Sequence, residues 1–137
     1  MSETSAIGWD GFHHVAMKVN DFEATYRFYV DGLGFSVKRK WQRAGISGAL
    51  VDTGGGNYLE ISGGGEKRTQ QDSTFIHLAV RVADCEAATE RARSAGGEIT
   101  VEPKDVEIPS DPPIKAKISF CEGPDGESIE FFQNDST

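Results

Sequence analysis

Two histidines and two glutamates are the side chains in this sequence whose types and spacing could do chemistry together. His14 opens an apolar run near the start of the chain, and His77 opens a similar run 63 residues later. Glu60 and Glu130 each lie inside a later apolar segment, YLEIS and SIEFF respectively. Imidazole nitrogens and carboxylate oxygens, without a thiolate, suit divalent Ni, Zn, Co, Mn or Fe. A carboxylate beside such a cation can also move a proton between neighbouring carbons.

The four residues belong to an internal duplication of the chain. Residues 12–35, FHHVAMKVNDFEATYRFYVDGLGF, align without a gap on residues 75–98, FIHLAVRVADCEAATERARSAGGE, and His14 falls on His77. A lone histidine or glutamate on a strand is usually structural or solvent-facing. Pseudo-twofold symmetry brings matched positions near a common axis, so the duplication favours a metal site over four unrelated side chains.

Each copy of the duplication predicts the element order βαβββ. Alternating apolar residues predict a strand in VAMKV and in LAVRV, and helical spacing follows over about residues 21–32 and 84–95. Asp21 and Asp84 are the expected N-caps of these helices. Three further strands are predicted in each copy, in FSVKRKWQR, ISGALVDT and NYLEIS and in GEITVE, IKAKISFCE and ESIEFF. We therefore expect an α+β fold, with two tandem βαβββ repeats forming curled mixed sheets around a metal-binding cleft.

The length of 137 residues predicts one domain with its own hydrophobic core. The expected parts are a flexible tail at 1–10 and one domain at 11–137, with repeat one at 11–62, a polar linker at 62–73 and repeat two at 74–133. Four prolines in residues 103–114 predict a stiff loop, because proline disfavours helices and interior strands.

Charge and composition argue against two classes of partner. The 22 acidic and 14 basic residues give a net charge of −8, which repels nucleic acid and anionic lipid alike. The sequence contains no secretory signal and no apolar stretch long enough to span a bilayer, so we expect a cytoplasmic protein. Cys85 and Cys121 form no CxxC motif and are expected to be small buried side chains, not a disulfide.

Strand parity predicts which side chains share a face, because residues two apart on a strand point the same way. The apolar residues of each strand should pack on a helix. The candidate metal ligands should then lie on the opposite, concave faces, and they are His14, Glu60, His77 and Glu130. His13 has the opposite parity and its matched residue is Ile76, so we interpret it as structural.

Three cations are candidates for binding a substrate carboxylate. Lys18 and Arg81 share the faces of the two histidines, and Lys117 lies on a neighbouring strand. Solvated charge at a sheet edge is the equally weighted alternative for each of them.

The sequence resembles the vicinal oxygen chelate superfamily over about residues 11–133, on the segments HVAMKVNDFEATYRFYVDGLGF, YLEIS, HLAVRVAD and GPDGESIEF. The resemblance implies that one divalent metal ion is bound by a His-Glu-His-Glu set similar to that of glyoxalase I: His14, Glu60, His77 and Glu130. It further implies that Glu130 or Glu60 is the catalytic base, and that the substrate is a small α-oxo compound or a hemithioacetal, with glutathione or another thiol as the adduct.

The function that the residues favour is a metal-dependent lyase or isomerase that works through an enediolate. The alternatives are a non-catalytic small-molecule binding protein of the bleomycin-resistance type and an extradiol dioxygenase. A protein that only sequesters a drug has no need of four metal ligands, and the dioxygenases use two histidines and one carboxylate.

Homodimerisation is expected from the aromatic content. The aromatic residues exceed what one helix can cover, and they are Trp9, Phe12, Tyr26, Phe28, Tyr29 and Trp41. In the resembled superfamily the cleft closes either within one chain or, as in glyoxalase I, at the subunit boundary. The sequence leaves these two arrangements open.

Overall fold

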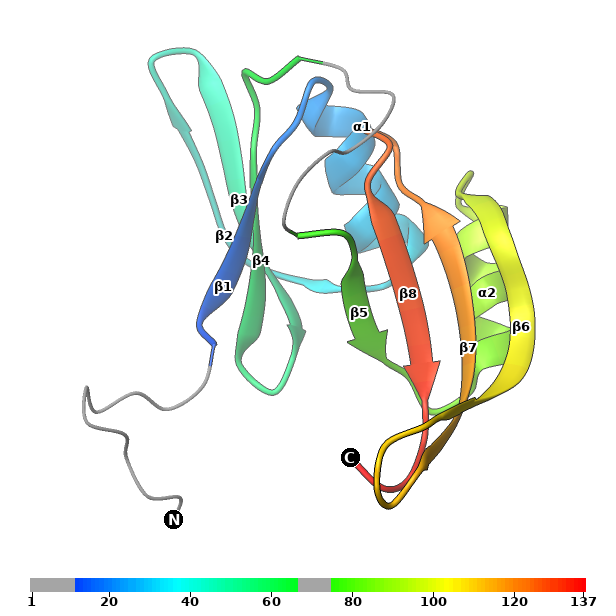
Figure 1. Ribbon diagram of the computed structural model, residues 1–137. Helices are drawn as coiled ribbons and strands as arrows, with labels where there is room; N and C mark the ends of the chain where they lie inside the picture. The colour runs from blue at the N-terminus through cyan, green and yellow to red at the C-terminus, as the bar shows by residue number, and fades with distance from the viewer. Residues whose placement is uncertain (1–11, 67–74) are drawn as a thin grey trace, which may run out of the picture.

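Two four-stranded mixed sheets, each packed against its own helix, form the structure (Figure 1). It is a computed structural model that describes residues 12–66 and 75–137. The strand order is β1-β4-β3-β2 in the first sheet and β5-β8-β7-β6 in the second. The predicted α+β class and the tandem βαβββ order are confirmed.

The two repeats have the same element order. The first consists of β1 (His14–Lys18), α1 (Phe22–Arg27), the π-helical turn η1 (Phe28–Gly32), β2 (Ser36–Arg43), β3 (Ile46–Gly54) and β4 (Asn57–Ser62). The second consists of β5 (Leu78–Arg81), α2 (Cys85–Ser94), β6 (Glu98–Ile108), β7 (Ile114–Glu122) and β8 (Ser128–Gln133). In each sheet the first strand of the repeat pairs in parallel with the last, and the other pairs are antiparallel.

The predicted N-caps of both helices are confirmed. Asp21 Oδ1 accepts a hydrogen bond from the Ala24 amide at 3.0 Å, and Asp84 Oδ1 accepts one from the Ala87 amide at 3.1 Å. These contacts satisfy first-turn amides that have no partner within the helix. Among residues 12–66 and 75–137, no helix has the length and apolar character that crossing a membrane requires.

The expectation of a loop over residues 103–114 is wrong for its first half. Strand β6 extends to Ile108, so Pro103 lies inside a strand. Proline is tolerated there because β6 is at the edge of the sheet and its pairing with β7 is irregular between Val101 and Lys104. Only residues 109–113 remain as the connection to β7.

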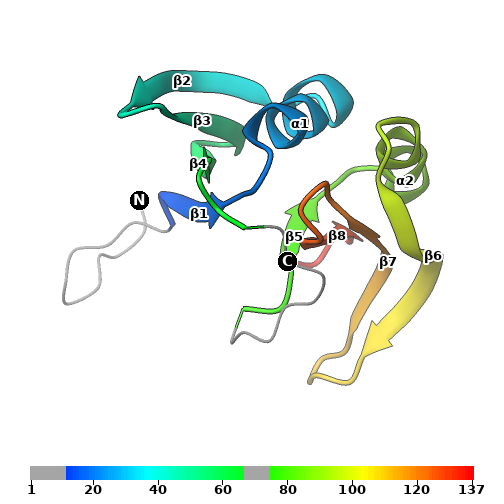
Figure 2. The same cartoon turned by 90° about the horizontal axis from the view of Figure 1, so that it is seen from above.

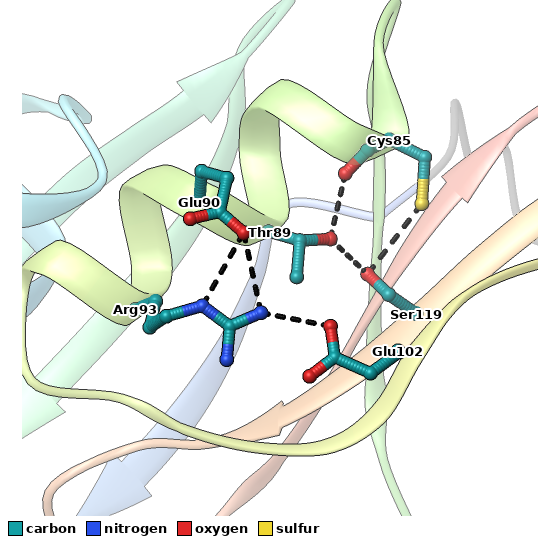
Figure 3. Close-up of polar contacts among 6 residues, drawn as sticks. All are labelled: Cys85, Thr89, Glu90, Arg93, Glu102 and Ser119. Atoms are coloured by element: carbon teal, nitrogen blue, oxygen red, sulfur yellow. Dashed lines mark hydrogen bonds and ion pairs between the residues drawn. The ribbon is translucent and has the colours of Figure 1, made fainter.

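The second helix is fixed to its sheet by polar contacts on two sides (Figure 3). Inside, the hydroxyls of Thr89 and Ser119 lie 2.7 Å apart, and Thr89 also donates to the Cys85 carbonyl oxygen at 2.7 Å. Outside, the Arg93 guanidinium contacts a carboxylate oxygen of Glu102 on β6 at 2.7 Å. Buried hydroxyls are satisfied by each other here, so the helix position is well defined.

The two repeats meet through their helices and through the turn between β7 and β8 (Figures 1 and 2). The Arg91 guanidinium donates to the Gly32 carbonyl oxygen at 2.7 Å. A Cβ atom at Gly32 would lie 2.5 Å from the Cβ of Ala95, so a larger residue would separate the helices. This contact region lies on the helix side of both sheets and leaves their other faces uncovered.

Candidate metal centre

The four candidate metal ligands lie in the structure as two His-Glu pairs. His14 Nε2 lies 3.5 Å from Glu60 Oε1, and His77 Nε2 lies 3.1 Å from Glu130 Oε1. In the first pair His14 opens β1 and Glu60 lies on the parallel strand β4, and in the second His77 directly precedes β5 and Glu130 lies on the parallel strand β8. The duplication seen in the sequence is therefore also a duplication of the site.

Strand parity places both glutamates on the face away from the helix, as predicted. Leu59 and Ile61 flank Glu60 and are buried in the core. Ile129 and Phe131 flank Glu130 in the same way. The second pair is the more enclosed, because the Glu130 side chain is 11% exposed and that of Glu60 is 32% exposed. The edge of the His77 ring also packs on Phe120, with 5.3 Å between centroids.

The geometry of each pair fits a divalent cation. Two donors that each lie about 2.1 Å from one ion, at an angle of about 90° to 110°, are about 3.0 to 3.4 Å apart. The observed separation is 3.1 Å in the second pair and 3.5 Å, slightly wider, in the first. Each pair therefore presents one nitrogen and one oxygen at close to the spacing of neighbouring metal ligands.

The two His-Glu pairs do not come together into one group of four within a single chain. Within residues 12–66 and 75–137, no group of three or more His, Cys, Asp or Glu side chains could hold a metal ion. Catalytic metal sites have three or more protein ligands, so one His-Glu pair alone has too few donors for such a site. We call each pair a half-site.

A cleft of about 560 Å³ lies between the first strands of the two repeats. Its lining includes His14 and His77, one from each half. Four exposed apolar side chains, Phe12, Val15, Phe75 and Ile76, also line it. Exposed apolar side chains beside the two half-sites mark this surface as one that another molecule could cover.

The three candidate substrate-binding cations do not all lie on the same faces as Glu60 and Glu130. Lys18 lies on the face of His14, as expected from parity, and Arg81 shares the face of Glu130, because its neighbour two positions earlier, Ala79, pairs with Glu130. Arg81 is partly engaged, because its guanidinium donates to the carbonyl oxygen of Thr137. Both side chains remain exposed and near a half-site.

Lys117 does not lie with the half-site of its repeat. Its ammonium contacts Glu86 of α2 at 3.0 Å, and this pairing raises the pKa of Lys117. The residue has the parity of Ser119, whose hydroxyl faces Thr89 of α2, whereas Glu130 lies on the opposite face of the sheet. The register of β7 therefore places the candidate substrate cation Lys117 on the helix side of the second sheet, away from Glu130.

His13 contacts the half-site although strand parity assigned it a structural role. Its Nδ1 lies 2.9 Å from Nδ1 of His14. The residue precedes β1, so the alternation that holds within a strand does not apply to it. Two adjacent histidines were the only signal of this contact in the sequence.

Trp41 also shares the face of the first half-site. It lies directly opposite Gly48, and the same row continues through Ser62 to Lys18. The indole covers Gly48 so closely that a Cβ there would lie 2.4 Å from the ring. Trp41 is 41% exposed, so an aromatic ring faces solvent beside Gly48 and Ser62. Its cross-strand row lies on the same face as Glu60, two residues along β4 from the row that contains Glu60.

Comparison with known proteins identifies the family. The Glyoxalase/Bleomycin resistance protein/Dioxygenase superfamily profile matches residues 11–131. The chain belongs to this superfamily. A lactoylglutathione lyase of Haemophilus influenzae is 31% identical over 130 residues, which cover 90% of this chain and 93% of that protein. A probable lactoylglutathione lyase of Vibrio cholerae is 28% identical over 130 residues, with 88% of each chain covered.

Solved structures of the superfamily share the fold. Glyoxalase I from Zea mays superposes with a TM-score of 0.75 at 26% identity, over 92% of this chain and 45% of the maize chain. A glyoxalase family protein from Enterococcus faecalis gives a TM-score of 0.71 at 25% identity, over 90% of this chain and 98% of that one. Together with the named relatives, these matches support a glyoxalase-type function for this member of the superfamily.

Proposed function

We propose that the protein is a metal-dependent glyoxalase-type lyase or isomerase that acts on a small α-oxo compound or hemithioacetal. The observation that carries the proposal is the pair of matched His-Glu contacts, close to metal-ligand spacing, on the faces that the helices leave open. The relatives named lactoylglutathione lyase support a hemithioacetal of glutathione as the substrate. Another thiol in place of glutathione is compatible with the same chemistry.

One divalent ion would be bound by two imidazoles and two carboxylates, those of His14, Glu60, His77 and Glu130. Ni, Zn, Co, Mn and Fe all accept this donor set. When bound, the ion supplies a Lewis acid that stabilises negative charge developing on two vicinal oxygens of the substrate.

Glu130 is proposed as the base, because it is the less exposed of the two carboxylates. It removes a proton from the carbon next to the substrate carbonyl and returns that proton to the neighbouring carbon. One C–H bond breaks and another forms, and the hydroxyl proton moves from the oxygen of the first carbon to the oxygen of the second. The isomerisation therefore needs no external oxidant or reductant. Lys18 and Arg81 are the cations placed to bind a carboxylate of the substrate or of its thiol.

A second copy of the chain would complete the site. Each half offers two donors, and exposed apolar side chains surround the cleft between them. In a homodimer, the first half of one chain would face the second half of its partner, and the apolar surface would be buried. The proposal therefore includes two equivalent sites per dimer.

The decisive test is turnover of the glutathione hemithioacetal of methylglyoxal by stripped protein reconstituted with each candidate metal. Glu130→Gln should lower kcat by roughly 10² to 10⁴, because the amide keeps an oxygen donor but cannot take a proton. Glu86→Gln is the matched control, since Glu86 is an exposed carboxylate on α2, which packs on the other face of the second sheet. Unchanged turnover in Glu130→Gln would remove Glu130 as the base, and no turnover of the wild type with any metal would favour a non-catalytic binding protein.

A further inference from the structure

We propose that His13 is a positioning residue that holds the His14 imidazole with its Nε2 atom toward the metal. This inference rests on the proposed metal site. The two Nδ1 atoms lie 2.9 Å apart, and His14 Nε2, on the other side of the ring, lies 3.5 Å from Glu60. His14 therefore has a partner at each of its two ring nitrogens.

His13 is itself fixed by strand β4. Its carbonyl oxygen accepts a hydrogen bond from the Tyr58 amide at 2.9 Å, and its ring lies 5.1 Å from the Tyr58 ring between centroids. Tyr58 and Glu60 are two residues apart, so they share one face of β4. Strand β4 therefore affects both ring nitrogens of His14. Glu60 lies near Nε2, and Tyr58 holds His13, whose ring contacts Nδ1.

The hydrogen bond selects a tautomer once a cation is bound. Two Nδ1 atoms in contact need one hydrogen between them. A cation held by Nε2 of His14 would leave Nδ1 as the protonated nitrogen of that ring, so Nδ1 of His13 would be the acceptor. Partners of this kind fix the orientation of a ligating imidazole, and their loss typically costs 10-fold to 100-fold in metal affinity.

The second half-site orients its histidine by a different contact. Ile76 occupies the position matched to His13 and cannot form a hydrogen bond through its side chain. His77 instead has its ring packed edge-on against Phe120. The two halves are therefore not equivalent, and the effect of removing His13 should have no counterpart at Ile76.

The test is calorimetric titration of the stripped full-length protein with Zn²⁺ alone. His13→Ala should weaken Zn²⁺ binding by about 10-fold to 100-fold. His13→Asn should recover most of that loss, because its amide oxygen can accept the same hydrogen bond. Ile76→Leu, the matched control, keeps an apolar side chain in the cleft lining and should bind Zn²⁺ as tightly as wild type. Circular dichroism of each variant would confirm that it is folded.

Two outcomes would overturn the role of His13 while leaving the metal site standing. One is wild-type affinity in His13→Ala. The other is equal weakening in His13→Ala and His13→Asn, which would indicate loss of ring volume, not of an acceptor. Failure of the wild type itself to bind Zn²⁺ or any other candidate cation would instead contradict the proposed function.

Discussion

The hydroxyl of Tyr29 donates a 2.7 Å hydrogen bond to the carboxylate of Glu127 and thereby joins the first repeat to the β7–β8 turn of the second. Tyr29 is fully buried, and burial raises its pKa well above the usual tyrosine value. Burial is also the main cause of a raised pKa at Glu127, although the Tyr29 hydrogen bond lowers it. A carboxylate that is costly to ionise therefore lies at the junction between the repeats.

Glu127 should make the junction less stable as the pH rises. Because its pKa is raised in the folded state, the folded protein binds a proton more tightly than the unfolded chain does. This stabilisation is fully present below the ordinary glutamate pKa of about 4.3 and is lost as the pH rises through the raised value. Urea unfolding across this range should therefore show a steeper fall in stability for wild type than for Glu127→Gln. Equal slopes would contradict the prediction.

Tyr29→Phe tests the other partner of the same bond. Without the hydroxyl, the carboxylate loses a hydrogen bond that favours its ionised form, so the pKa of Glu127 should rise further. We expect a loss of about 1 to 3 kcal/mol in the free energy of unfolding at neutral pH. Urea denaturation measures it, and an unchanged midpoint would show that the bond does not stabilise the fold.

His77→Ala should abolish tight metal binding without unfolding the protein, because the ring is partly exposed and lies outside the core. Asp84→Ala is the opposite control. It removes the 3.1 Å cap of α2 and should cost roughly 1 kcal/mol of stability while leaving metal affinity nearly intact. Metal titration and thermal unfolding of both variants separate the two effects. Retained metal in His77→Ala would remove this residue from the ligand set.

Mixing two inactive variants tests whether a site is shared between chains. We expect sedimentation at about twice the chain mass of 14.9 kDa. A mixed dimer of His14→Ala and His77→Ala chains would contain one site with both histidines and one with neither. Activity and metal binding should therefore return on mixing, after subunit exchange. Recovery of neither would place each site within one chain, and a monomer with full metal stoichiometry would refute the dimer.

Trp41 should set a preference for substrates with a flat apolar group. Its exposed indole lies in the row next to that of Glu60, where a ring of the substrate could stack on it. Trp41→Ala should lower the kcat/KM ratio of phenylglyoxal to methylglyoxal hemithioacetals by about tenfold. Lys40→Ala is the control, because Lys40 precedes Trp41 but points to α1, 4.2 Å from the Tyr26 ring centroid. An unchanged ratio in Trp41→Ala would indicate that the indole packs over Gly48 but does not contact the substrate.

The sequence predicted most of the fold because its local signals agree with one another. The duplication fixed the element order, and Asp21 and Asp84 marked the helix starts correctly. Glu60 and Glu130 could be assigned to a face because each lies between apolar residues in a strand of period two. These are properties of neighbouring residues, which a single sequence contains.

The errors concern properties that depend on distant residues. Pro103 is tolerated only because β6 became the edge strand, and sequence alone does not set strand order. The alternation of apolar residues in IKAKISFCE was misleading for Lys117. Ile114, Ala116, Ile118 and Phe120 share one parity, but the side that faces α2 carries Lys117 and Ser119. The contact of His13 depends on how the chain enters β1, where no periodic pattern exists.

Burial of both cysteines protects this protein from its own proposed substrate. Cys85 and Cys121 are fully buried and unpaired, and burial raises the pKa of the Cys121 thiol to about 11. Little Cys121 thiolate would therefore exist at neutral pH, and the thiolate is the form that attacks electrophiles. An α-oxo aldehyde in the cleft is such an electrophile, so a chain with exposed thiols would be modified by the compound it consumes. The fold keeps its only two thiols out of reach of that reaction.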